Sequence, residues 1–371
     1  MNYAGRLTAA VAIAGVLSLG ACGTDNNTGG GGSTGASAAP ASSGGSDLSG
    51  TINAAGSSAQ ANAIDEWKKA FQSQNPSVNI NYQPSGSGAG IQSFIQGTVA
   101  FAGSDSALKD DEAPQADARC KTGKAINLPM VTGPVAVVYN LSGVDGLQLS
   151  PTTIAGIFNS KITKWDDPAI KKDNPDAKLP STPIQAFHRS DESGTSDNFT
   201  KFLKAAAAND WPYEPAKAWP AEAKGQGAKG SDGIAQAIKS TDGAISYVEL
   251  SYAENSSLSK AKVANGSGEF VELTPESAGK TVEAAEIAGT GNDLKLNIDY
   301  ATSAAGAYPI VLVTYEITCE KGLPADQVEL VKSFLGYTAS DAGQQKLTEL
   351  GYAPLPATLL AKVRTAVEAI S

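Results

Sequence analysis

Apolar and polar residues alternate along the first part of the chain in a way that predicts strands and helices in turn. Gly50 to Ala55 is typical of a short strand, and a turn of glycine and serine follows it. Ile64, Trp67 and Phe71 then recur at helical spacing, and residues 78–82 alternate as a strand does before a second glycine-rich turn and a second helix. Repeated strand–turn–helix units predict an α/β sheet whose ligand crevice lies where strands end and helices begin.

Two later segments contain a proline next to an apolar strand, and we interpret them as two hinge crossings between two lobes. In the first, Leu128 to Val131 leads into Val135 to Tyr139; in the second, Tyr308 and Pro309 precede Ile310 to Ile317. Helical patterns from Asp326 onward indicate that the last segment returns to the first lobe. The predicted boundaries are residues 48–131 with 309–371 for lobe I, and 132–308 for lobe II.

The N-terminus has the pattern of an export signal. Arg6 precedes an apolar run from Leu7 to Leu19, which is too short to span a bilayer and is typical of a signal peptide over residues 1–21. The end of this run, Leu19-Gly-Ala-Cys22, resembles the lipobox of bacterial lipoproteins, which implies cleavage before Cys22 and acylation of its thiol, for example with palmitate. The alternative is an ordinary signal peptide with a chance cysteine.

Residues 22–47 are rich in glycine and serine, and residues 23–47 lack large apolar side chains, so we expect a flexible tether rather than a packed segment. We therefore expect an exported protein that is anchored to the outer face of the bacterial cell membrane by its N-terminal lipid alone. Once Cys22 is acylated, Cys120 and Cys319 remain as an even pair in an oxidising compartment, which favours a disulfide. Two buried free thiols are the alternative.

The composition restricts the classes of function. The 371 residues are 41% hydrophobic, enough for one large or two ordinary domains. With 38 acidic and 28 basic side chains, the net charge of −10 disfavours binding to nucleic acid. One histidine and three cysteines are too few for the common zinc sites, so we expect neither a metal nor a cofactor.

Three turns share a composition that suits the binding of an oxyanion. They contain Ser57, Ser87 and Ser193, and each precedes a helical pattern, so free backbone N–H groups and a helix dipole would face the ligand. Each turn alone is also a common helix N-cap. Near the third turn, Arg189 can grip two oxygens of a tetrahedral anion, and Asp191 can orient it or form a simple surface ion pair.

Taken together, these motifs resemble the substrate-binding protein of the bacterial phosphate-specific ABC transporter (PstS family). The resemblance runs from about Leu48 to near the C-terminus and is specific in order and spacing. It rests on Ala55-Gly-Ser-Ser-Ala, Tyr82-Gln-Pro-Ser-Gly-Ser-Gly, Ala102-Gly-Ser-Asp105, Lys164-Trp-Asp-Asp, Arg189-Ser-Asp-Glu-Ser-Gly-Thr-Ser196, Gly230-Ser-Asp-Gly-Ile and Gly243-Ala-Ile-Ser-Tyr-Val. It implies an α/β periplasmic-binding-protein fold, a two-lobed Venus flytrap clamp in which each lobe is a sheet flanked by helices and phosphate is buried in the cleft.

The resemblance also implies a set of ligand-binding residues. These are Ser57, Ser58, Ala59, Ser87, Asp105, Arg189, Ser193, Gly194 and Thr195, with Asp191 behind Arg189. The family often has threonine and phenylalanine where this chain has Ser58 and Ala59, which puts an aromatic cover over the anion in doubt. Asp105 is informative because an ionised carboxylate only accepts hydrogen bonds, so it favours a protonated phosphate and disfavours sulfate.

We therefore expect a monomeric binding lipoprotein, not an enzyme, that captures inorganic phosphate and delivers it to the permease subunits of an ABC transporter for import. One alternative is a secreted phosphatase or esterase that uses Ser193 with His188 and Asp191; the sequence around Ser193 lacks the G-x-S-x-G elbow of such enzymes. Another is a binding protein for a different oxyanion, such as sulfate, molybdate or a phosphonate.

Overall fold

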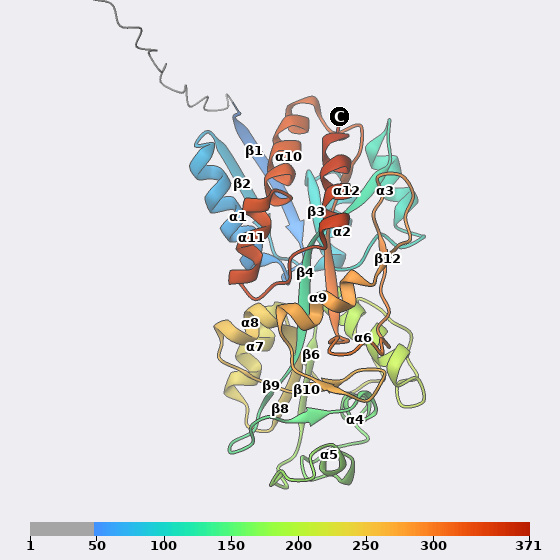
Figure 1. Ribbon diagram of the computed structural model, residues 1–371. Helices are drawn as coiled ribbons and strands as arrows, with labels where there is room; N and C mark the ends of the chain where they lie inside the picture. Colours follow the sequence, from blue (N-terminus) through green and yellow to red (C-terminus); the bar gives the residue numbers. More distant parts are fainter. Residues whose placement is uncertain (1–47) are drawn as a thin grey trace, which may run out of the picture. The chain divides into compact units, whose positions relative to one another are not determined.

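The computed structural model describes residues 48–371, and its first part follows the predicted alternation of strands and helices (Figure 1). In helix α1, Ala63, Ile64, Trp67 and Phe71 are buried on one face, which is the spacing that the sequence suggested. The elements are β1 (Gly50–Gly56), α1 (Ala61–Gln74), β2 (Val78–Gln83), α2 (Ser87–Ile95), β3 (Phe101–Ser104) and α3 (Ala113–Cys120).

A long strand, β4 (Ala125–Asn140), links two groups of elements. Its first part pairs with β14 (Val311–Cys319), and its second part, from Val135, pairs with β8 (Ala244–Glu249). The strand therefore runs without interruption through the segment that we interpreted as the first hinge crossing. Thr314 pairs with Val131 and Tyr315 with Pro129, so Met130 is the extra residue of a β-bulge.

The main sheet has nine strands in the order β2-β1-β3-β14-β4-β8-β6-β7, with β9 also paired to β4. In Figure 1, β1–β3, α1–α3 and α10–α12 form an upper lobe, and β6 and β8 with α4–α8 form a lower lobe. The remaining strands are β5 (Gln148–Leu149), β6 (Gln185–Arg189), β7 (Gln226–Ala228), β9 (Ser259–Lys260), β10 (Lys262–Ala264), β11 (Phe270–Val271), β12 (Glu286–Ile287) and β13 (Leu296–Asn297). The remaining helices before β14 are α4 (Pro151–Phe158), α5 (Pro168–Asp173), α6 (Gly194–Ala206), α7 (Gly230–Ser240), α8 (Leu250–Asn255) and α9 (Pro275–Glu283).

The C-terminal helices lie against the first strands of the chain. Helix α10 contacts β1 and α1, and the ring of Phe334 packs edge-on against Phe71 with their centroids 5.4 Å apart. The indole of Trp67 donates a hydrogen bond to the carbonyl of Gly343. The upper lobe is thus built from both ends of the described chain. These helices are α10 (Ala325–Thr338), α11 (Asp341–Glu349) and α12 (Ala357–Glu368).

A disulfide joins Cys120, at the end of α3, to Cys319, at the end of β14. Their Cα atoms are 5.4 Å apart, within the usual range for such a bond. The structure therefore has the predicted pairing rather than two free thiols. The disulfide links two positions that are 199 residues apart in the sequence.

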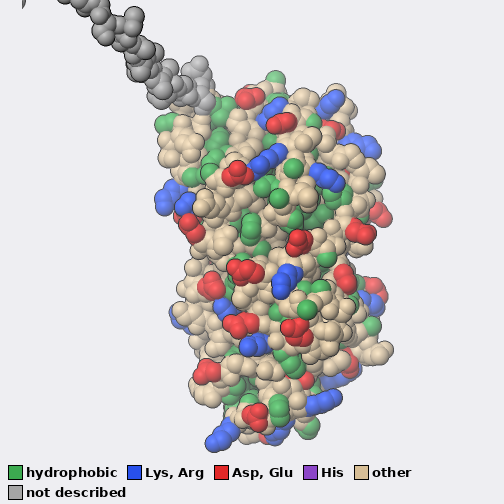
Figure 2. All heavy atoms as spheres, in the orientation of Figure 1, with side chains coloured by type: hydrophobic (Ala, Val, Ile, Leu, Met, Phe, Trp, Pro, Cys, Tyr) green, Lys and Arg blue, Asp and Glu red, His purple; other side chains and the backbone are tan. Residues whose placement is uncertain are grey.

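The surface carries mixed charges. Figure 2 shows acidic and basic side chains interspersed over one face of the molecule, without a large area of one sign. Within residues 48–371, no helix is both long and apolar enough to cross a bilayer. The predicted signal peptide, the lipobox cysteine and the tether lie outside the described residues.

Candidate functional site

The three predicted turns lie at the ends of strands and the starts of helices, and they meet between the two lobes. Ser57 to Ala59 follow β1, Ser87 opens α2, and Ser193 is the N-cap of α6. The first turn depends on Gly56, which has a φ of +145°, because a Cβ there would stand 2.0 Å from the carbonyl oxygen of Gly103. The backbone can therefore pass close to β3 and bring the serines to the lobe interface.

Asp105 lies at the centre of this arrangement and is 2% exposed. Its Oδ2 accepts hydrogen bonds from the hydroxyls of Ser57 at 2.7 Å and Ser87 at 3.2 Å, and its Oδ1 accepts one from Thr314 at 2.8 Å. Burial raises the pKa of Asp105 to about 6, and the nearby charge of Glu249 adds to this rise, although the hydroxyls of Ser57 and Thr314 oppose it. Asp105 is thus an acceptor surrounded by hydroxyl donors.

Arg189 lies at the end of β6, is 2% exposed, and is held by Asp191. Its Nε and Nη2 donate to the two carboxylate oxygens of Asp191 at 2.8 and 2.5 Å. Burial alone would raise the pKa of Asp191, but the hydrogen bond and charge of Arg189 outweigh it and the pKa is lowered. Asp191 therefore occupies the Nε–Nη2 edge of the guanidinium. Its Nη1 points to Thr195 and Ser231.

The start of α6 brings the lower lobe against Asp105. The amide of Gly194 donates to the hydroxyl of Ser87 at 3.1 Å, and the hydroxyl of Ser193 caps the helix by accepting from the amide of Ser196. A Cβ on Gly194 would stand 2.5 Å from that of Asp105, so no larger residue fits there. The backbone amides in the first turn of a helix have no acceptor within that helix. In α6 these amides face the place where the upper and lower lobes meet.

Ser58 and Ala59 link the first turn to three other segments. The hydroxyl of Ser58 is 2.9 Å from that of Ser231 in α7, and the amide of Ala59 donates to Ser57 Oγ. The carbonyls of Ser58 and Ala59 accept hydrogen bonds from Tyr252 and Tyr352. Two aromatic side chains, Tyr252 from α8 and Tyr352 from the segment after α11, therefore contact this turn. Ala59 itself contributes no aromatic ring.

The structure therefore brings all nine predicted ligand-binding residues into one buried cluster, eight of them through hydrogen bonds within it, with Asp191 behind Arg189. Ser193 belongs to it through the helix that it caps. We call this set, with Ser231, the anion cluster: Ser57, Ser58, Ala59, Ser87, Asp105, Arg189, Ser193, Gly194, Thr195 and Ser231. Further contacts hold the lobes together around it, including Asn198 Nδ2 to the carbonyl of Asp105 at 2.7 Å.

Sequence reasoning missed three polar residues at this place. Ser231 and Glu249 lie within or directly after motifs that the sequence singled out, Gly230-Ser-Asp and Gly243 to Val248, but their side chains were not assigned to the site. Thr314 had no local signal, because it reaches Asp105 from β14, 209 residues away.

The residues of the alternative triad are engaged elsewhere. The ring of His188 stacks on Trp219 with centroids 5.0 Å apart, and its Nδ1 is 2.9 Å from the carbonyl of Arg189. Asp191 binds Arg189, and Ser193 caps its helix. This geometry provides no base for Ser193 from His188.

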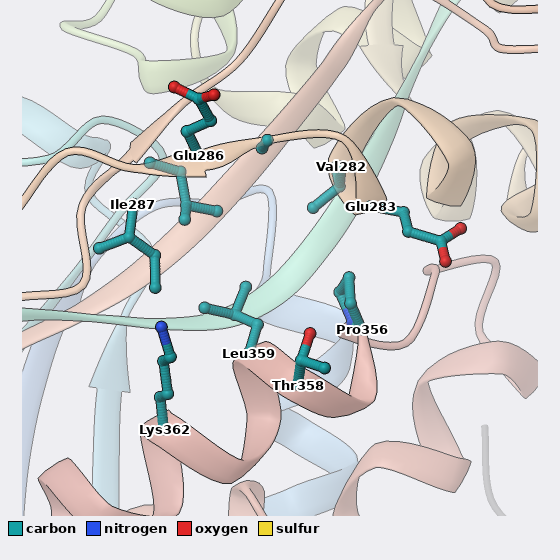
Figure 3. A pocket seen from close by; sticks show the side chains of 10 residues that line it. Val282, Glu283, Glu286, Ile287, Pro356, Thr358, Leu359 and Lys362 are labelled. Carbon is teal, nitrogen blue, oxygen red and sulfur yellow. The ribbon is translucent and has the colours of Figure 1, made fainter.

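A separate hollow lies on the surface. A pocket of about 380 Å³ is formed by α9, β12 and the start of α12, with Val282, Leu359 and Lys362 among its lining residues (Figure 3). None of the anion cluster residues lines it. The cluster is closed to solvent, so its interior is distinct from this open pocket.

Comparison with known proteins gives a consistent result. Residues 41–342 match the model of a PBP superfamily domain. The chain is 44% identical over 373 residues to phosphate-binding protein PstS 3 of Mycobacterium tuberculosis, with 99% of each chain covered. It is 42% identical over 364 residues to PstS 3 of Mycobacterium leprae, covering 96% and 97%.

Solved structures share the fold. A phosphate ABC transporter substrate-binding protein from Clostridium perfringens, described as putative and solved with bound phosphate, aligns with a TM-score of 0.60 at 20% identity. The alignment covers 83% of this chain and all of that one. A phosphate-binding protein from Stenotrophomonas maltophilia aligns with a TM-score of 0.65 at 22% identity, covering 85% and 94%. The predicted two-lobed clamp is thereby confirmed as a fold.

Proposed function

Because this chain belongs to the PstS family of phosphate-binding proteins, we propose that it captures inorganic phosphate in the anion cluster and passes it to an ABC transporter for import. The relatives are named as phosphate-binding proteins, and on this proposal no bond is made or broken. The observation that carries the proposal is the pairing of a buried acceptor, Asp105, with donors from the opposite lobe, Arg189 and the start of α6.

This pairing suits an anion that still carries a proton. Mono- and dibasic phosphate can donate a hydrogen bond to Asp105, whereas sulfate at neutral pH has no proton to donate. On this account Ser57 and Ser87 hold Asp105 in place, and Arg189 Nη1 and the start of α6 supply donors to the remaining oxygens. A sulfate oxygen and the Asp105 carboxylate would face each other as two acceptors without a proton, which would weaken sulfate binding by several kcal/mol.

The proposed clamp opens and closes about the two crossings near residues 131 and 309, with lobe I as 48–131 and 309–371 and lobe II as 132–308. Donors come from both lobes, so phosphate would favour the closed form through contacts that the open form lacks. Permease subunits would then recognise the closed monomer.

The proposed location follows from residues 1–47. A signal peptide over residues 1–21 and acylation of Cys22 would place the folded part outside the cell, at the end of a flexible tether. The support for this is the sequence pattern, including the resemblance to a lipobox.

Calorimetric titration tests the function. The phosphate-stripped wild-type protein should bind phosphate and bind sulfate at least about a thousandfold more weakly. Asp105→Asn should bind phosphate and also gain sulfate binding, because an amide can donate to a fully ionised oxyanion. Wild-type protein that binds sulfate as tightly as phosphate would refute the phosphate assignment.

A further inference from the structure

Glu249 lies at the end of β8 against the anion cluster, and its position is unusual for an acid. It is completely buried, and its Oε1 accepts a hydrogen bond from the hydroxyl of Thr195 at 2.5 Å. Within the described residues, its Oε2 has no hydrogen-bond partner. A buried oxygen without a partner is costly, so this arrangement calls for an explanation beyond packing.

The charges around Glu249 do not balance. Asp191 accepts hydrogen bonds from two N–H groups of Arg189, so its negative charge already balances the positive charge of Arg189. The negative charges of Glu249 and Asp105 are additional. Other groups that face Glu249 come from several elements and carry no positive charge: Tyr252 in α8, Tyr352 after α11, and Asp105 after β3, each of which feels the charge of Glu249. Asp232 in α7 adds a further negative charge near Tyr252. An anion that enters here meets an excess of negative charge.

Thr195 connects this charge to the anion, because a hydroxyl has a single proton. Its Oγ1 accepts from Arg189 Nη1 at 3.5 Å and gives its proton to Glu249. In that state Thr195 offers only lone pairs to an anion. If Glu249 carried a proton, it would donate to Thr195 Oγ1, and the Thr195 hydroxyl would be free to donate to the anion.

We propose that Glu249 couples phosphate binding to the uptake of one proton. When dibasic phosphate binds, a proton from solvent is taken up on Glu249, the Glu249 hydroxyl donates to Thr195 Oγ1, and the Thr195 hydroxyl turns to a phosphate oxygen. No covalent bond changes apart from this proton. The inference rests on the proposed function, since it concerns the same anion.

Glu249→Gln separates this role from a structural one. The amide is the same size, is neutral at every pH, and can donate to Thr195 Oγ1 permanently. Phosphate titrations at pH 6 and pH 8, in buffers with different ionisation enthalpies, measure the affinity and the number of protons taken up. Glu222→Gln is the matched control, because it removes the same charge from an exposed position outside the cluster.

We expect Glu249→Gln to bind phosphate at least about tenfold more tightly than wild type at pH 8, the effect of one added charge-assisted hydrogen bond. The difference should shrink at pH 6, and the proton uptake seen with wild type and Glu222→Gln should fall. A variant that binds with wild-type affinity and wild-type proton uptake at both pH values, or that is weakened equally at both, would overturn the proposal. A wild-type protein that does not bind phosphate would instead reject the proposed function.

A second measurement covers the case in which Glu249→Gln does not fold, as judged by circular dichroism. The carboxyl carbon of Glu249 in wild-type protein, labelled with carbon-13 glutamate, reports its protonation by chemical shift. At pH 8 the signal should move to that of a protonated acid when phosphate is added. A signal that stays at one position with and without phosphate would contradict proton uptake at this residue.

Discussion

Replacing Glu316 by glutamine should stabilise the protein at neutral pH. Glu316 lies in β14, is completely buried, and pairs in register with Gly103 of β3. Both of its carboxylate oxygens and Oε1 of Gln60 have no hydrogen-bond partner within the described residues. Burial raises the pKa of Glu316 to about 8; interaction with Gln60 opposes the rise, and the charge of Asp105 adds to it. At pH 7 the folded protein therefore holds a proton here that the unfolded chain releases.

The size of the effect follows from this difference in proton binding. Because the pKa of Glu316 in the folded state is above the usual 4.5, the contribution of Glu316 to stability falls as pH rises from about 4.5 to about 8 and is constant outside that window. About 2.5 pH units separate 4.5 from 7, and each corresponds to about 1.4 kcal/mol, so about 3.5 kcal/mol is lost by pH 7. Glutamine cannot ionise and avoids this loss.

Urea unfolding of wild type and Glu316→Gln at pH 4.5 and pH 7.5, followed by circular dichroism, measures the free energies of unfolding. The variant should gain about 3.5 kcal/mol relative to wild type on going from the lower to the higher pH. Glu222→Gln, an exposed change, should show no such gain. If Glu316→Gln loses stability equally at both pH values, Glu316 is ionised and paired, and the reasoning is wrong.

Three further changes test the cluster and the N-terminus. Arg189→Lys should weaken phosphate binding about a hundredfold in calorimetry, because an ammonium cannot hold Asp191 through two parallel bonds and also reach Thr195; unchanged affinity would remove Arg189 from the site. Gly194→Ala should abolish phosphate binding while the far-ultraviolet circular dichroism stays native, since its Cβ collides with Asp105; native affinity would show that the lobes need not approach so closely. Cys22→Ala should move the protein from the membrane to the soluble fraction with phosphate affinity intact, and a variant still in the membrane fraction would contradict the lipid anchor.

The sequence predicted the local elements well where one periodicity dominates. Ile64, Trp67 and Phe71 lie on one face of α1, and burial alternates at Val78 and Ile80 in β2. The proline at position 129 was less informative, because β4 accommodates it with a bulge at Met130 and continues into the lower lobe. From the sequence alone, Pro129 does not reveal whether the pairing with the neighbouring strand can shift by one residue to accommodate the proline.

The site was predictable as a set of residues but not as a hydrogen-bond network. Helix-start serines, Arg189 and Asp105 are visible as motifs, whereas the direction of each proton depends on partners that are distant in sequence. Thr314 binds Asp105 across 209 residues, and Glu249 takes the Thr195 proton across 54. Such contacts follow from sheet order, which no local pattern encodes.

The most direct test of the account is a crystal structure of the protein grown with phosphate. The account predicts tetrahedral density inside the anion cluster, with one oxygen within hydrogen-bond distance of Asp105 and others facing Arg189 Nη1 and Thr195. Density for phosphate only at another place, such as the pocket between α9 and α12 in Figure 3, with the cluster unchanged, would contradict it.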